Sequence, residues 1–191
     1  MRLLVVVGLV FLSFYSCQKE SKILAFGMYK AELTVQDNQK LPFNFYVQNS
    51  NKLIIYNAEE EIQVTDIRYK NDSVIIQTPV FEGYIKAKVT DSGLNGEFVK
   101  ESYDRIVPFK AIKSEHRFEV TKEPAHQISG NWETVFSKHL EGEYIAKGIF
   151  KQYGTSVTGT FRTTTGDYRY LQGVVDGDSL KLSTFDGAHA F

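Results

Sequence analysis

From residue 27 onward, apolar and polar side chains alternate in short runs that polar turns separate. In YKAELTV (29–35), the odd-numbered residues are apolar, whereas Lys30, Glu32 and Thr34 are polar. Similar runs follow along the chain: FNFYV, KLIIY, SVIIQT, YIKAKV and GEFVK. Alternation with a period of two, bounded by Asn, Asp, Ser and Gly, is typical of antiparallel strands with one buried face. The pattern therefore predicts an all-β protein.

The alternating region contains two copies of one unit. GMYKAEL begins at Gly27 and resembles GNWETVF, which begins at Gly130, so that Tyr29 corresponds to Trp132. NDSVIIQT resembles GDSLKLST, and FEG resembles FDG, in the same order along the chain. Ordered repeats indicate tandem modules, and we expect two antiparallel meander modules, each a curled sheet or small barrel. Tyr29 and Trp132 should both be largely buried on the first strand of their modules.

The second copy is shorter than the first. Residues 84–113 continue the first copy after Gly83, whereas four residues follow Gly187 in the second. We therefore expect the second module to be incomplete, without its closing strands. The final stretch STFDGAHAF should then lie at or near a sheet edge, with Phe185 and Phe191 partly uncovered, because an unfinished sheet exposes unpaired backbone groups.

The first 17 residues, MRLLVVVGLVFLSFYSC, have a different pattern. Arg2 precedes an apolar run that is too short to span a membrane, which needs roughly 20 residues, and Ser16 precedes Cys17. This order is typical of a secretory signal, and FYSC resembles a lipobox, where a bacterial lipoprotein is acylated on cysteine and then cleaved. We expect a signal helix over residues 1–16 and a lipid on Cys17. The alternative is an ordinary signal peptide with a chance cysteine.

These features give an expected organisation and location. We expect a signal peptide at residues 1–16 and a lipid anchor with its tether at 17–26. The first β-module then covers 27–115, the linker 116–128, and the incomplete second β-module 129–191. A lipid-anchored chain belongs to the cell envelope, on the periplasmic side or at the outer-membrane surface, and its first partner is the membrane.

Composition narrows the function classes. The chain carries 22 Lys and Arg against 23 Asp and Glu, a net charge of −1, without basic clusters. Nucleic acid is therefore not an expected partner. Cys17 is the single cysteine, so no internal disulfide is expected, and an acylated Cys17 leaves no thiol for redox chemistry.

Several long motifs carry a resemblance to a known family. PFNFYV, VPFKA, SGNWETVF and VTGTFRTTTGDYRYLQGVVDGDSLKLSTFDGAHAF resemble the N-terminal part of envelope lipoproteins of Gram-negative bacteria. Those lipoproteins carry a C-terminal thioredoxin-like domain of the TlpA disulfide-reductase type. The resemblance implies that the full-length protein is a thiol-disulfide oxidoreductase whose Cys-x-x-Cys pair lies beyond Phe191. It also implies client proteins and the thioredoxin-like domain as partners.

Two polar stretches contain the candidate site residues. TTTGDYRYLQG and FDGAH supply a cluster that could bind a ligand or partner, formed by Asp167, Arg169, Asp186 and His189. The alternative is a structural turn network, in which Asp167 bonds its own backbone. No metal, cofactor or catalytic residue is expected, and DGDSL (176–180) is interpreted as a hairpin turn rather than a calcium loop.

Two function classes follow. The first is a non-catalytic, membrane-anchored β-domain that spaces a reductase domain from the membrane or presents clients to it. The second is a β-barrel-like binding module for a small apolar ligand or an envelope partner. The two differ in whether aromatic side chains fill the module or leave a cavity of ~300 Å³ or more.

Overall fold

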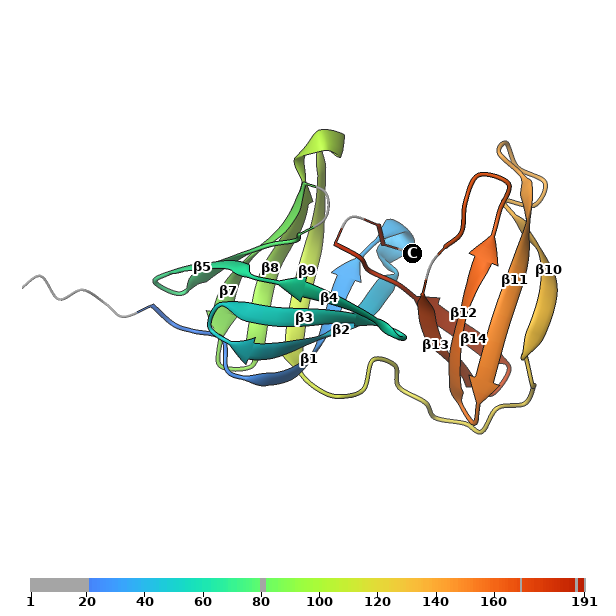
Figure 1. Ribbon diagram of the computed structural model, residues 1–191, viewed down its shortest axis with the longest axis horizontal. Coiled ribbons are helices and arrows are strands. Elements are labelled where there is room, and N and C mark those ends of the chain that lie inside the picture. The colour runs from blue at the N-terminus through green and yellow to red at the C-terminus, as the bar shows by residue number, and fades with distance from the viewer. Residues whose placement is uncertain (1–20, 80–81, 169, 188, 191) are drawn as a thin grey trace, which may run out of the picture.

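The computed structural model describes residues 21–79, 82–168, 170–187 and 189–190 (Figure 1). The expected signal helix and Cys17 lie outside these residues. Within the described ranges, no helix is long and apolar enough to cross a membrane.

The protein is all-β, as the alternation predicts. Nine strands form the first sheet: β1 (Gly27–Thr34), β2 (Lys40–Asn49), β3 (Lys52–Asn57), β4 (Glu60–Val64), β5 (Asp66–Lys70), β6 (Ser73–Gln77), β7 (Gly83–Thr90), β8 (Gly93–Lys100) and β9 (Arg105–Lys113). Five strands form the second sheet: β10 (Gly130–Phe136), β11 (Tyr144–Tyr153), β12 (Ser156–Arg162), β13 (Leu171–Asp176) and β14 (Ser179–Ser183). Two short 3-10 helices, η1 (Gln36–Asn38) and η2 (Glu101–Tyr103), lie in connections of the first module.

The first sheet is a nearly closed barrel, hereafter module 1. Its strand order is β4-β3-β2-β1-β9-β8-β7-β6-β5, so the first strand pairs with the last one and the two end strands follow each other directly in sequence. In β1, Tyr29, Ala31 and Leu33 are at most 2% exposed, as their alternation predicts. Tyr29 stacks on Phe45 with ring centroids 5.2 Å apart. The barrel interior is therefore filled by alternate side chains from all its walls.

The second sheet, hereafter module 2, is a curled antiparallel meander with strand order β10-β11-β12-β13-β14. Its buried apolar cluster is small and consists of Phe150, Val157 and Val175, with partly buried neighbours. Figure 1 shows module 2 at one end of the long axis of the molecule, joined to module 1 by the linker that follows β9.

The expectation for Trp132 is wrong. Its side chain is 47% exposed, whereas the corresponding Tyr29 is 2% exposed. The difference follows from topology, because β9 lies beside β1, whereas β10 pairs with β11 alone among the described strands. Trp132 lies on the edge strand of an open sheet, and its indole Nε1 donates a hydrogen bond to the Ile128 carbonyl at 2.7 Å.

The expectation that Phe185 is partly uncovered at a sheet edge is also wrong. Phe185 is fully buried, not at a sheet edge, while Phe191 lies outside the described residues. After β14 the chain leaves module 2 and enters module 1, where the Phe185 ring lies 4.3 Å from Phe43 and 5.2 Å from Phe98 between centroids. The hydrophobic effect favours this arrangement, because it transfers the aromatic ring of Phe185 from water into the apolar core of the barrel.

The tether before β1 also packs against the barrel. Leu24 is 2% exposed and belongs to the core of module 1. The backbone N–H of Lys22 donates to the Asn71 carbonyl at 2.6 Å, and the Lys22 ammonium pairs with Asp91 at 2.5 Å. Residues 21–26 are therefore part of module 1 rather than a free tether.

Candidate functional site

The structure divides the four residues of the predicted cluster. Asp186 and His189 are together: His189 Nδ1 lies 2.9 Å from Asp186 Oδ2, and the His189 N–H donates to Asp186 Oδ1 at 2.7 Å. These bonds close the turn around Gly187, whose φ of +94° favours glycine. For this pair the contacts are those of a structural turn network.

Asp167 lies elsewhere, on the connection between β12 and β13. It forms an isolated antiparallel bridge with Arg162 and lines a cleft of module 2. Arg169 and the proposed lipid site Cys17 lie outside the described residues. Of the predicted cluster, the structure therefore brings Asp186 and His189 together in a turn and places Asp167 separately, in the cleft.

The sequence did not predict the role of Arg117 in the linker, whose guanidinium makes six hydrogen bonds to other described residues. It is 4% exposed and lies between the modules. On module 1 its guanidinium donates to the carbonyls of Pro42 and Tyr56, at 3.1 and 3.0 Å, and to Asn57 Oδ1 at 3.4 Å. On module 2 it donates to Ser183 Oγ and the Ser183 carbonyl, both at 3.0 Å, and to Gln172 Oε1 at 3.1 Å.

All these acceptors are neutral, so burial acts on Arg117 without a compensating carboxylate among them. Desolvation lowers the pKa of Arg117 to about 9, and the guanidinium therefore remains charged at neutral pH. Five N–H donors in a fixed plane can satisfy carbonyls on two surfaces at once. Arg117 is suited to fix the two modules at one angle.

Hydrogen bonds around Asn57 form a second connection between the modules. Asn57, at the end of β3, is fully buried and bonds the backbone of Phe185 in both directions. Its Nδ2 donates to the Phe185 carbonyl at 2.8 Å, and the Phe185 N–H donates to Asn57 Oδ1 at 3.0 Å. The next residue, Ala58, donates its N–H to Gln172 Oε1 at 3.0 Å. We call Arg117, Asn57, Gln172, Ser183 and Phe185 the joint.

The linker is held along module 2 as well. Asp176 Oδ1 accepts the N–H groups of Thr121 and Lys122, both at 2.8 Å, and Asp176 Oδ2 pairs with the Lys181 ammonium at 2.7 Å. These contacts hold the pKa of Asp176 well below its ordinary value. The largest effect comes from Lys181, followed by the N–H groups of Thr121 and Lys122. Asp176 pairs with Ser179 across a tight turn, which confirms that DGDSL is a hairpin.

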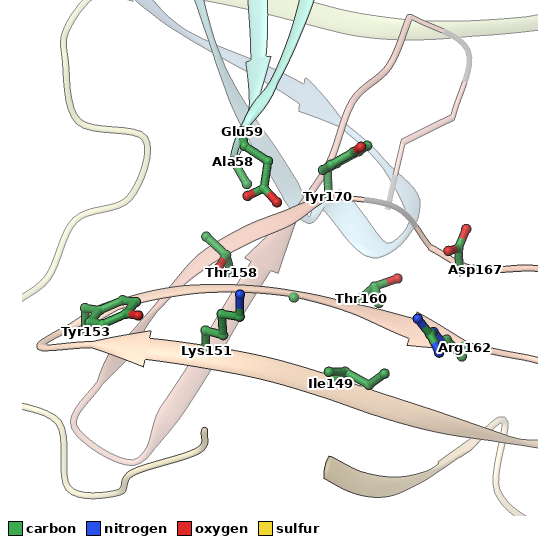
Figure 2. Close-up of a pocket in the computed structure, with 11 residues that line it drawn as sticks. Ala58, Glu59, Ile149, Lys151, Tyr153, Thr158, Thr160, Arg162, Asp167 and Tyr170 are labelled. Carbon is green, nitrogen blue, oxygen red and sulfur yellow. The ribbon is translucent and has the colours of Figure 1, made fainter. Parts of the chain in front are cut away.

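Beside the joint, the β3–β4 turn of module 1 and one face of module 2 enclose an open cleft of about 840 Å³. Figure 2 shows Glu59 on this turn, facing Lys151 of β11 and Thr158 of β12. Tyr153, whose side chain is 79% exposed, lies at one end of the cleft, and Arg162 lies toward the other.

The cleft is polar and carries both signs of charge. Lys151 and Arg162 provide cations, Glu59 and Asp167 provide acids, and threonine hydroxyls lie between them. Within the described part of the chain no ion pair joins these four groups, so they are available to a ligand. The arrangement suits a ligand with hydroxyl and carboxylate groups and an apolar face for tyrosine.

No arrangement typical of a metal site occurs among the described residues, where no three His, Cys, Asp or Glu side chains converge. Sequence reasoning found Asp167 through its turn sequence, but neither Arg117 nor the cleft cations. The arginine stands in a linker without periodicity, and Lys151 and Arg162 occupy ordinary outward positions of alternating strands. Compared with known proteins, the chain matches no protein-family model, no curated protein and no solved structure.

Proposed function

We propose that this chain is the non-catalytic, membrane-anchored β-domain of a thioredoxin-family, TlpA-like thiol-disulfide oxidoreductase lipoprotein. Its role is to hold the reductase at a fixed distance from the membrane and to present clients to it. The observation that carries the proposal is the joint, because Arg117 and Phe185 turn two modules into one body. A spacer needs this rigidity, since a flexible connection would let the modules fold back toward the bilayer.

The position of the tether supports the same role. Residues 21–26 are pinned to module 1 by Leu24 and Lys22, and Figure 1 shows the described N-terminal end on the side of module 1 away from module 2. A lipid on Cys17, four residues before Ser21, would bring module 1 close to the bilayer. Module 2 would then be the part farther from the membrane.

The packing of module 1 favours a spacer over a container for an apolar ligand. Its interior holds Tyr29, Phe43, Phe45, Phe98 and Phe109 from its own strands. Phe185 fills a further part of it from the C-terminal segment. Aromatic side chains thus occupy the barrel volume that an apolar ligand would need.

The direct test is to read the gene beyond the codon for Phe191. The proposal expects an in-frame thioredoxin-like sequence with a Cys-x-x-Cys pair, and a gene without one would overturn the reductase part. The spacer part is tested by distances between spin labels on Lys70→Cys and Lys138→Cys, one on each module, in a Cys17→Ser background. A single narrow distribution is expected, whereas a broad one would show that the modules move freely.

A second function is favoured by the cleft. Its mixed charges, hydroxyls and exposed Tyr153 suit a polar envelope saccharide rather than the apolar ligand expected from the sequence. The probe is a soluble muropeptide, which carries sugar hydroxyls and carboxylates. Calorimetry should give saturable binding that Lys151→Ala weakens and that Lys70→Ala, on β5 outside the cleft lining, leaves unchanged. Equal binding by both variants would remove the cleft from consideration.

A further inference from the structure

The segment before β1 exposes two large apolar side chains. Ile23 is 52% exposed and Phe26 is 61% exposed, whereas Leu24 belongs to the buried core of module 1. The segment is held in place, because the Ser21 Oγ accepts the Asn71 N–H at 3.1 Å and the next N–H of the chain donates to the Asn71 carbonyl at 2.6 Å. The outward position of Ile23 and Phe26 is therefore fixed by packing and hydrogen bonds around them.

Further apolar side chains lie on the two strands that flank the start of β1. Tyr46 is close to the end of β2 and Ile112 is close to the end of β9, and both ends lie beside the first residues of β1. Tyr46 is 38% exposed and Ile112 is 52% exposed. Together with Ile23 and Phe26 they form what we call the anchor face of module 1. Exposed apolar side chains gathered in one region mark an interaction surface.

The same end of module 1 is basic. Lys52 begins β3, Lys70 ends β5 and Lys113 ends β9, and none of the three forms an ion pair with another described residue. Two nearby acids, Asp72 and Asp91, are each paired with another lysine. The anchor face is therefore bordered by lysines whose charge is not neutralised within the described part of the chain.

The other end of module 1 has the opposite character. Three acids in a row, residues 59–61, follow the far end of β3. The C-terminal segment enters module 1 at this end, where Asn57 bonds the backbone of Phe185 and Phe185 pairs with Ala190. In Figure 1 the C-terminal end accordingly lies between the modules, whereas the described N-terminal end lies on the far side of module 1. The C-terminal segment thus covers the acidic end and leaves the anchor face open.

The short connection to Cys17 indicates what covers the anchor face. Cys17 precedes Ser21 by four residues, and an extended chain spans at most ~3.6 Å per residue. A lipid on Cys17 would therefore hold Ser21 within ~14 Å of the lipidated residue. The surface beside Ser21 would then be the part of the protein nearest to the bilayer.

We propose that the anchor face lies on the bilayer, with Ile23 and Phe26 inserted among the head groups of anionic phospholipids and the three lysines beside their phosphates. This rests on the proposed membrane-anchored function and names the surface that orients the protein. Apolar side chains bordered by basic residues bind the membrane interface through buried apolar area and attraction to anionic lipids. A lipid on Cys17 limits the distance from the membrane, whereas the anchor face also sets the direction in which module 2 points.

The first test supplies the anchor chemically. Because Cys17 is the single cysteine, the chain from residue 17 can be coupled through its thiol to a maleimide lipid in vesicles of phosphatidylglycerol and phosphatidylethanolamine. In a Trp132→Phe background, brominated lipid should quench the emission of Phe26→Trp. The matched control is Ile106→Trp, since Ile106 is also 61% exposed but lies near the opposite end of β9, and its emission should not change. Equal quenching of both, or of neither, would overturn the proposal.

The second test measures binding without an anchor, by cosedimentation of the Cys17→Ser chain with the same vesicles. Ile23→Ser combined with Phe26→Ser should weaken binding at least ~10-fold, while Ile106→Ser should leave it unchanged. Lys70→Gln should weaken binding about 5-fold, and Lys151→Gln on module 2 should not. Unchanged binding in the double variant or in Lys70→Gln would contradict the proposal.

Sedimentation without vesicles distinguishes the bilayer from a second copy of the chain. We expect a monomer. A dimer that Ile23→Ser with Phe26→Ser dissociates would assign the anchor face to a second copy and would overturn the proposal. Because the first test supplies the anchor chemically, its failure does not bear on whether Cys17 is acylated in cells, which metabolic labelling decides. The gene and spin-label tests of the proposed function are likewise unaffected.

Discussion

Replacing Arg117 with methionine should uncouple the two modules. The guanidinium bonds both modules directly, with three acceptors on each. Methionine keeps much of the side-chain volume but donates no hydrogen bond. The variant therefore removes the six hydrogen bonds of Arg117, while it leaves the Asn57–Phe185 hydrogen bonds and the Phe185 packing in module 1 in place.

The expected loss of stability is about 3 kcal/mol. A buried acceptor left without its donor costs ~1–3 kcal/mol, and several acceptors lose Arg117 together. The gain from no longer burying a charge offsets part of this loss, and the lowered pKa of Arg117 shows that burial is unfavourable. With a urea dependence of ~2–3 kcal/mol per molar, the midpoint of unfolding should fall by ~1–1.5 M.

The assay compares two signals in one urea titration. Trp132 lies on β10, and because it is the single tryptophan, its fluorescence reports module 2, whereas far-ultraviolet circular dichroism reports both modules. In the wild type the two curves should coincide, as in a cooperative unit. In Arg117→Met the fluorescence curve should move to lower urea than the dichroism curve.

The matched control is Arg68→Met on β5, because the side chain of Arg68 is 63% exposed and β5 contributes no residue to the joint. Its unfolding should match the wild type. If Arg117→Met also keeps coincident curves and an unchanged midpoint, Arg117 does not couple the modules and the spacer argument loses its main support.

Three further predictions concern other parts of the chain. Phe185→Ala should lower the free energy of unfolding by ~3–5 kcal/mol, while Leu140→Ala on the surface should not, as urea titration can measure. Asp176 has a depressed pKa in the folded state, so its stabilising contribution is present above about pH 4 and lost as pH falls further; Asp176→Asn should flatten this acid dependence of the melting temperature. A palmitate analogue should label the wild type but not Cys17→Ser in cells, and equal labelling would exclude the lipid anchor.

The sequence was most informative where one face of a strand is buried. The alternation predicted β1, β2, β3, β6, β7 and β8 as strands. In β1 it also predicted the inward face, and the burial of Tyr29, Ala31 and Leu33 confirms that face. It was least informative for β4 and β5, the end strands of the sheet, whose burial patterns are mostly partial or exposed.

The repeat predicted two antiparallel modules but not the different surroundings of their first strands. Trp132 and Tyr29 occupy equivalent positions in the repeat, yet the burial of Tyr29 depends on β9, which the structure places beside β1. The joint could not be predicted from short sequence patterns for a similar reason. Arg117 stands in a stretch without periodicity, and its partners are 55 to 75 residues away in sequence. Local patterns do not contain such pairings.

The joint also shows that the sequence boundary between the modules is not a folding boundary. Module 1 buries Phe185, which lies 128 residues from its partner Asn57, so the barrel core is complete only after module 2 has been synthesised. Contacts of such long separation slow folding, because loop closure must precede the gain from packing. A chain cut in the linker would leave module 1 with the same void as Phe185→Ala and without Arg117. The two modules are therefore expected to gain their full stability together, which is the behaviour that a rigid spacer requires.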